Sequence, residues 1–154
     1  MRHLTLITGG TRGIGAAIAE RLAEDGHDPV LGYLRDDRAA ERTAERVRAR
    51  GAACTLVRAD VADDEGIEAL FAAAAGAGTL TGVVNNAGAT YRYAPLDETP
   101  TDEIRRTYAV NLVGPTLVAR AAVSALAAGG VIVNVSSGAA TIGLSGESVH
   151  SAAA

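Results

Sequence analysis

The chain carries a glycine-rich octapeptide, TGGTRGIG, at residues 8–15. Residues 4–7 before it form a short apolar run typical of a strand, and the residues after it repeat at helical spacing from Ile14 to Leu22. Glycine permits a sharp turn and a close approach of a ligand to the backbone, and the free amides of a helix N-terminus suit a pyrophosphate. The octapeptide therefore predicts a dinucleotide cradle, although an ordinary strand-to-helix loop can also contain glycines.

The rest of the chain continues the alternation of strand and helix. The pattern predicts strands at residues 29–33, 54–59, 80–85 and 131–135, and helices at 36–50, from Asp63 through Phe71, and at 102–128, with Thr101 as a cap and a bend at Pro115. No linker or repeat interrupts the sequence, so we expect a single domain over residues 1–154. Right-handed crossovers then give an α/β fold, a doubly wound parallel sheet of strand order 3-2-1-4-5.

The composition argues against several classes of function. A net charge of -4 and an aromatic fraction of 3% disfavour a nucleic-acid partner. No apolar run reaches the length of a membrane span and no signal peptide precedes the first strand, so we expect no membrane association and a cytoplasmic location. All 14 basic residues are arginine, which excludes lysine chemistry, and the sequence predicts no metal site.

The single cysteine and a row of arginines indicate structure rather than function. Cys54 is the only cysteine, and its apolar neighbours predict a small buried side chain in a strand. Arg38, Arg42, Arg46 and Arg50 recur at fourfold spacing and predict a solvated helix face.

Three stretches later in the chain occur together with the octapeptide. They are NNAG at residues 85–88, Asn111 within a predicted helix, and NVSS at residues 134–137. In this order, and with the spacing Thr-Gly-x-x-x-Gly-x-Gly, they resemble the short-chain dehydrogenase/reductase family. The resemblance covers the whole chain, which corresponds to only the first part of that family's usual domain. It implies a Rossmann-like fold truncated after the fifth strand.

The resemblance implies that the chain binds a nicotinamide dinucleotide. The implied cofactor-binding residues are Gly9, Thr11, Arg12, Gly13, Ile14, Gly15, Tyr33, Arg35, Asp60, Val61, Asn86, Ala87 and Gly88. An acidic residue at the end of the second strand would bond a ribose 2′-hydroxyl and repel a 2′-phosphate. This chain has Tyr33 and Arg35 there, with Arg12 in the turn, and a pair of guanidinium groups favours NADP. The acidic residues 36 and 37 follow closely and weaken that preference.

The resemblance also implies a catalytic set of Asn, Ser, Tyr and Lys, which this chain matches in part. Asn111 and Ser137 fit the first two roles. The Tyr position falls on Ser151 or, as the less favoured assignment, on His150, and the Lys position falls one residue beyond Ala154. A serine hydroxyl is a poor general acid without a neighbouring base, whereas an imidazole titrates in a suitable range. We therefore expect impaired carbonyl reduction.

Two classes of function are open at this point. The first is an NADP(H)-binding relative of these oxidoreductases that acts on a small-molecule substrate, weakly or with groups supplied by another chain. The second is a repurposed scaffold, either a non-redox enzyme of the cyclase or isomerase type that uses Ser137, Ser151, His150 or Tyr93, or a non-catalytic interaction protein.

The predicted fifth strand indicates whether the chain associates with another chain. Residues 131–135 are apolar at almost every position, as in a parallel strand buried on both faces. Without the family's later helices, however, this strand would be an uncharged edge with one face exposed to water. We therefore expect a homo-oligomer or a complementing partner chain.

Overall fold

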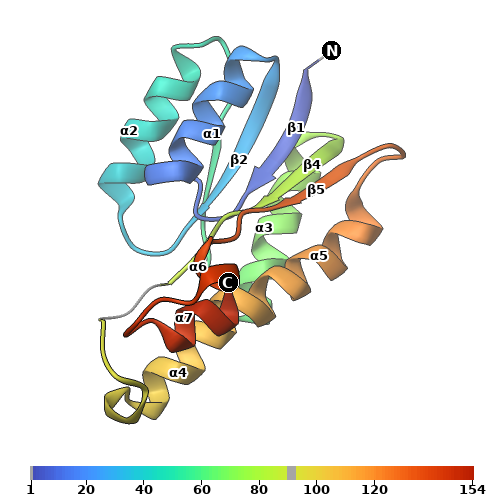
Figure 1. Ribbon diagram of the computed structural model, residues 1–154. Coiled ribbons are helices and arrows are strands. Elements are labelled where there is room, and N and C mark those ends of the chain that lie inside the picture. The colour runs from blue at the N-terminus through green and yellow to red at the C-terminus, as the bar shows by residue number, and fades with distance from the viewer. Residues whose placement is uncertain (1, 90–92) are drawn as a thin grey trace.

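The computed structural model describes residues 2–89 and 93–154, and its centre is a five-stranded parallel sheet (Figure 1). The strands are β1 (His3–Ile7), β2 (His27–Tyr33), β3 (Thr55–Arg58), β4 (Leu80–Asn85) and β5 (Val131–Asn134). Their order is β3-β2-β1-β4-β5, and all neighbours pair in parallel. The predicted doubly wound α/β fold is confirmed.

Helices cover the sheet in two layers (Figure 1). One face carries α1 (Gly13–Glu24) and α2 (Asp37–Arg48), and the other carries α3 (Asp64–Ala77) and α5 (Gly114–Ala125). Figure 1 shows α4 (Thr101–Tyr108) continuing the line of α5 past the carboxyl ends of the strands. Right-handed crossovers on the two sides of β1 produce this arrangement. It places a crevice at the carboxyl edge, where the strand order reverses.

The predicted long helix after residue 101 is interrupted. A short 3-10 turn (Leu96–Glu98) precedes α4, and a π-helical segment (Ala109–Val113) separates α4 from α5. The irregularity therefore precedes Pro115, which lies in the first turn of α5, where a missing N–H is tolerated. The predicted cap at Thr101 is wrong, because this residue is already helical and Pro100 precedes it.

Two hydrophobic clusters fill the two faces of the sheet. Leu6, Leu70 and Val118 are fully buried on the face of α3 and α5. Ile7 and Leu31 are fully buried on the face of α1 and α2. Successive strand residues point to opposite faces, so Leu6 and Ile7 anchor one cluster each. The turn that follows β1 is thus supported from both sides.

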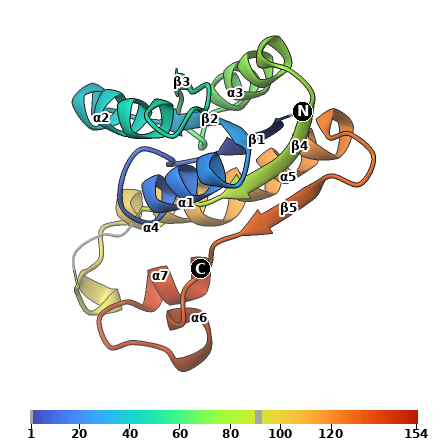
Figure 2. The same ribbon diagram turned by 90° about the horizontal axis from the view of Figure 1, so that it is seen from above.

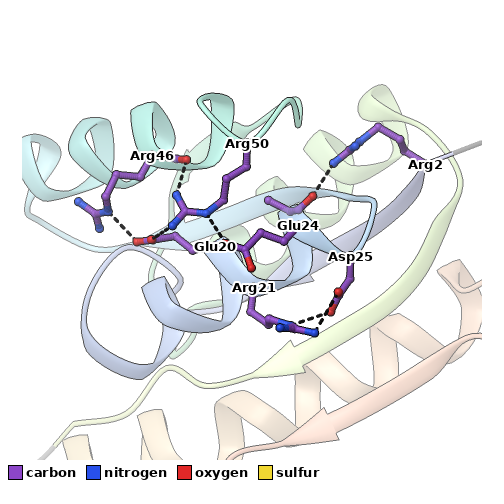
Figure 3. Close-up of polar contacts among 8 residues, drawn as sticks. Arg2, Glu20, Arg21, Glu24, Asp25, Arg46 and Arg50 are labelled. Carbon is purple, nitrogen blue, oxygen red and sulfur yellow. Dashed lines mark hydrogen bonds and ion pairs between the residues drawn. The ribbon is translucent and has the colours of Figure 1, made fainter.

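Arginine side chains join α1 to α2 (Figure 3). Arg46 Nε lies 2.6 Å from Glu20 Oε1, while the Arg50 guanidinium lies 2.7 Å from Glu20 Oε2 and 3.0 Å from Glu24 Oε1. Arg38, Arg42 and Arg46 are exposed, as a solvated face requires, and Arg50, which follows α2, is half-buried. The spacing of the row was correct, but it did not show that a neighbouring helix supplies the acidic partners.

The C-terminal residues extend beyond β5 (Figure 2). They form two short helices, α6 (Ala139–Ile142) and α7 (Ser148–Ala153), and α7 packs against α4. In β5 itself, Val131 is 59% exposed and Val133 is 49% exposed. The expectation of an edge strand with one face exposed to water is confirmed, because these two valines share a face and no strand of residues 2–89 or 93–154 pairs with the outer edge of β5.

Cys54 lies just before β3 and is only half-buried, so its predicted position as a buried strand residue is wrong. Its partial burial raises the pKa of the thiol to about 11. Within the described part of the chain, no cluster of histidine, cysteine and carboxylate groups is arranged to hold a metal ion. No described helix is both long and apolar enough to span a membrane.

Candidate functional site

The glycine turn joins β1 to α1 at the carboxyl edge of the sheet. Gly9 and Gly13 have φ values of 62° and 50°, a region that glycine adopts without strain. A Cβ placed on Gly13 would meet nothing within 4 Å, whereas one on Gly15 would collide with the Gly9 carbonyl oxygen. The backbone is therefore closely folded at Gly15 and open at Gly13.

The N-terminus of α1 begins in this turn. Arg12 occupies the cap position, and its side chain makes no capping hydrogen bond. Thr11 is buried, and the exposed Ile14 is the second residue of the helix. The first amides of a helix have no partner within the helix, and they coincide with the positive end of its dipole. This geometry suits an anionic group such as a pyrophosphate.

Two side chains hold the turn against the end of β4. Thr8 Oγ1 accepts hydrogen bonds from the backbone N–H groups of Asn86 and Ala87, each at 3.0 Å. Asn86 Nδ2 donates to the carbonyl oxygens of Thr8 and Gly9, also at 3.0 Å. The amide of Asn86 is thus engaged with the turn, and Thr8, which the sequence did not single out as a site residue although it begins the octapeptide, holds the turn to the end of β4.

Asp60 and Val61 follow β3, at the same carboxyl edge of the sheet as the glycine turn. The Asp60 carboxylate accepts from Arg106 at 2.6 Å and from the backbone N–H of Ala62 at 3.0 Å. Val61 is 8% exposed and packs beneath Gly114 of α5, where a Cβ would lie 2.8 Å from the Val61 carbonyl oxygen. No signal in the sequence indicated Arg106, which comes from α4.

The residues predicted to select NADP lie at the end of β2 and in the turn. Arg12 and Arg35 are both exposed. The Tyr33 hydroxyl donates to Asp37 Oδ1 at 2.9 Å, and this hydrogen bond raises the pKa of Tyr33. Arg58 Nη1 lies 4.0 Å from Asp37 Oδ2. The carboxylate that would oppose a 2′-phosphate therefore has a hydrogen-bond donor and a positive charge beside it.

A pocket of about 490 Å³ lies between α5, α7 and the segment that follows β5. Its wall contains three of the four candidate catalytic residues, Asn111, Ser137 and His150. The wall also contains residues 86–88, so the pocket adjoins the stretch that braces the glycine turn. The fold thus brings together residues from three distant parts of the sequence.

Asn111 has a defined orientation in this pocket. Its Oδ1 accepts from the backbone N–H of Ala89 at 2.7 Å, and its Nδ2 donates to the Ala89 carbonyl oxygen at 2.9 Å. Nδ2 also lies 3.4 Å from His150 Nδ1. Elsewhere in the pocket wall, Ser137 Oγ accepts from the backbone N–H of Ala139 at 3.2 Å, which leaves its hydroxyl hydrogen available to a ligand.

Two other candidates lie outside the pocket wall. Ser151 Oγ is buried and has no hydrogen-bond partner among the described residues. The Tyr93 side chain is 73% exposed, and its hydroxyl is hydrogen-bonded to Glu147, which raises the pKa of Tyr93. The structure therefore places His150, rather than Ser151, beside Asn111 and Ser137.

The model of a family described as short chain dehydrogenase matches residues 3–153. The cis-4-hydroxycyclohexanecarboxylate dehydrogenase of Sinomonas cyclohexanicum is 37% identical over 154 residues, which cover 98% of this chain and 61% of that protein.

Solved structures are similar over the same range. A short chain dehydrogenase from Burkholderia cenocepacia J2315 in complex with NADP has a TM-score of 0.92 and 36% identity, covering 98% of this chain and 62% of that one. An NAD+-bound xylitol dehydrogenase has a TM-score of 0.91 and 28% identity, covering 98% and 59%. The chain therefore spans about three-fifths of the length of these proteins.

Proposed function

The chain belongs to the short-chain dehydrogenase/reductase family, and from this membership we propose that it binds NADP(H) at the glycine turn. The observation that carries the proposal is the uncapped N-terminus of α1, which opens on a turn that has no side chain at Gly13. A pyrophosphate at this position would accept hydrogen bonds from the backbone and would meet no Cβ. A similar protein from Burkholderia cenocepacia is in complex with NADP.

We propose a small carbonyl compound or alcohol as the substrate, with impaired turnover. When bound, NADPH supplies a hydride to the carbonyl carbon, and the carbonyl oxygen must then gain a proton. Ser137, Asn111 and His150 line the pocket, and its described wall contains neither a tyrosine nor a lysine. A serine hydroxyl and a neutral imidazole are both weak acids near neutral pH, so proton delivery is the deficient step.

The preference for NADP rests on Arg12 and Arg35, since guanidinium groups bind phosphate in a forked geometry. Calorimetry with NADPH and NADH tests it on the unmodified chain. NADPH should bind more tightly, and the double substitution Arg12→Ala with Arg35→Ala should reduce that advantage by roughly tenfold or more, because each charge-assisted contact contributes about 1.5–3 kcal/mol. Equal affinity for the two cofactors would contradict the preference, and no binding of either would favour the non-redox or scaffold alternative.

The proposal includes assembly into a homo-oligomer. The exposed valines of β5 lie beside unpaired backbone groups, and β5 carries no charged residue and no proline. Such an edge favours pairing with another strand. A second copy of this chain presents the same uncharged edge, so two copies can pair through β5 about a twofold axis.

A further inference from the structure

The orientation of the Asn111 amide follows from its two contacts with Ala89. A backbone N–H can only donate and a backbone carbonyl can only accept. The atom that faces Ala89 N at 2.7 Å is therefore Oδ1, and the atom that faces Ala89 O at 2.9 Å is Nδ2. This assignment does not depend on any other residue of the pocket.

The same amide determines the state of the neighbouring imidazole. Nδ2 carries two hydrogens and no lone pair, and only one of the two is used by Ala89. His150 Nδ1, at 3.4 Å from Nδ2, must then accept rather than donate. A neutral imidazole whose Nδ1 accepts carries its hydrogen on Nε2.

We propose that Asn111 is a positioning residue that holds His150 as the Nε2–H tautomer, and that this N–H binds the carbonyl oxygen of a ketone or aldehyde in the pocket. His150 and Ser137 both line the pocket, and no described residue accepts a hydrogen bond from His150 Nε2. Two neutral donors thus line the pocket in which a carbonyl oxygen would lie. The choice of a carbonyl ligand rests on the proposed function, whereas the tautomer does not.

As a neutral donor, His150 can form a hydrogen bond to a carbonyl oxygen but cannot protonate it. It polarises a carbonyl by hydrogen bonding but keeps its own proton, because an imidazole anion is inaccessible near neutral pH. His150 is thus a binding group for the oxygen and not the missing proton donor. This role agrees with impaired turnover in a pocket that still accepts the substrate.

The tautomer can be measured without any ligand. Long-range hydrogen–nitrogen NMR spectra of the uniformly ¹⁵N-labelled chain distinguish the protonated ring nitrogen from the unprotonated one, and the chain has only 3 histidines. At pH about 8, where an ordinary imidazole is neutral, we expect an unprotonated Nδ1 and a protonated Nε2. The signals are assigned to His150 by their absence in His150→Gln. A protonated Nδ1 in the unmodified chain would overturn the proposal.

Substitutions of Asn111 test whether this residue sets the tautomer of His150. Asn111→Asp replaces the donor by a carboxylate oxygen, which accepts from Nδ1, so the tautomer should reverse. Asn111→Ala removes the contact, so the spectra should show both tautomers. An unchanged Nε2–H tautomer in both variants would show that Asn111 does not position the ring, and it would refute that part of the proposal.

The ligand is tested with cyclohexanone in the presence of NADP+, a pair that has no hydride to transfer. We expect the His150 signals to shift on titration and cyclohexanone to bind about fivefold more weakly to His150→Ala, which is the usual effect of one neutral hydrogen bond. His150→Gln retains an N–H donor and should recover part of the affinity. His3→Gln, at the start of β1 and outside the pocket wall, is the matched control.

The outcomes separate this inference from the proposed function. If NADPH does not bind but His150 is the Nε2–H tautomer, the proposed function fails and the tautomer assignment stands. If NADPH binds and cyclohexanone leaves the His150 signals unchanged, the carbonyl-binding role is refuted while the cofactor proposal stands.

Discussion

The turn after β1 and the segment after β5 both leave the carboxyl edge of the sheet, yet the protein fixes them very differently. Thr8 is 2% exposed and is bonded to the end of β4, and the turn beyond it lies between two buried clusters. After β5, Val135 is 37% exposed and Ile142 is 73% exposed, and short helices supply the local order. The turn is therefore held by its own contacts, whereas the segment after β5 leaves apolar surface exposed.

The largest effect is expected where the turn is most closely folded. In Gly15→Ala the new Cβ would overlap the Gly9 carbonyl oxygen and approach Asn86 Nδ2, and backbone atoms cannot move aside as a flexible side chain would. We expect a loss of about 3 kcal/mol in the free energy of unfolding, at the upper end of overpacking costs. NADPH binding should be abolished. Urea titration and calorimetry measure the two effects.

Gly76→Ala is the matched control for this substitution. Gly76 lies inside α3, and a Cβ there would meet nothing within 4 Å. Alanine is favoured over glycine within a helix, so this variant should be more stable by about 0.5–1 kcal/mol and should bind NADPH normally. If Gly15→Ala behaved in the same way, the turn would not be a close-packed cradle.

The bonds that hold the turn to β4 should give the next largest effect. Thr8→Val keeps the shape of the side chain but leaves the N–H groups of Asn86 and Ala87 without their acceptor. We expect a loss of about 2–3 kcal/mol, because unpaired donors in a partly buried site are costly. Thr116→Val is the control: Thr116 is exposed, and its one described side-chain hydrogen bond is to the Leu112 carbonyl of the preceding π-helical segment. Equal losses in the two variants by urea titration would contradict this reading.

The fold was predictable because its signals are local. The glycine turn, the apolar runs and the crossover rule determined the strand order before any contact was known. The partners of Arg46 and Arg50 were not predictable, since helical spacing gives a row of side chains and not the helix that it faces. The π segment was missed for a similar reason, because a proline at 115 predicts an irregularity but not its position or form.

The candidate site was predictable only in part. Asn111 and Ser137 were found from sequence stretches, and the fold brings both to one pocket. The choice between Ser151 and His150 could not be made from spacing, because neighbouring residues on a helix point about 100° apart. The orientation of α7, which the packing against α4 sets, places His150 in the pocket wall.

A matched pair of valines tests the difference between the centre and the edge of the sheet. Val84 and Val133 are partners in register on β4 and β5, but Val84 is 7% exposed and Val133 is 49% exposed. Val84→Ala should lower the free energy of unfolding by about 1–2 kcal/mol through lost burial and a cavity. Val133→Ala should change it by less than about 0.5 kcal/mol in the dissociated chain. Similar losses at low protein concentration would show that β5 is covered within the chain.

Assembly through β5 is tested with a charge at the same position. In sedimentation velocity at low micromolar concentration, the unmodified chain should associate and Val133→Lys should be monomeric, because a lysine on an edge strand opposes pairing. Leu34→Lys is the control, since Leu34 is 37% exposed and follows β2, which β1 and β4 separate from β5. A monomeric unmodified chain would refute the homo-oligomer, and dissociation by Leu34→Lys would show that the interface does not lie at β5.

The smallest effect concerns the ion pairs between α1 and α2. Glu20→Gln keeps the size of the side chain and an acceptor oxygen but removes the charge that Arg46 and Arg50 share at 2.6 and 2.7 Å. Because the pairs are partly exposed, we expect a loss of only about 0.5–1 kcal/mol, which added salt should reduce. Asp25→Asn removes the more exposed pair with Arg21 and should cost less. Ala19 and Val47 are fully buried on this face of the sheet, so apolar contact and not charge holds the two helices in place. A salt-independent loss as large as that of Val84→Ala would reverse this order and make the arginines the main support of the layer.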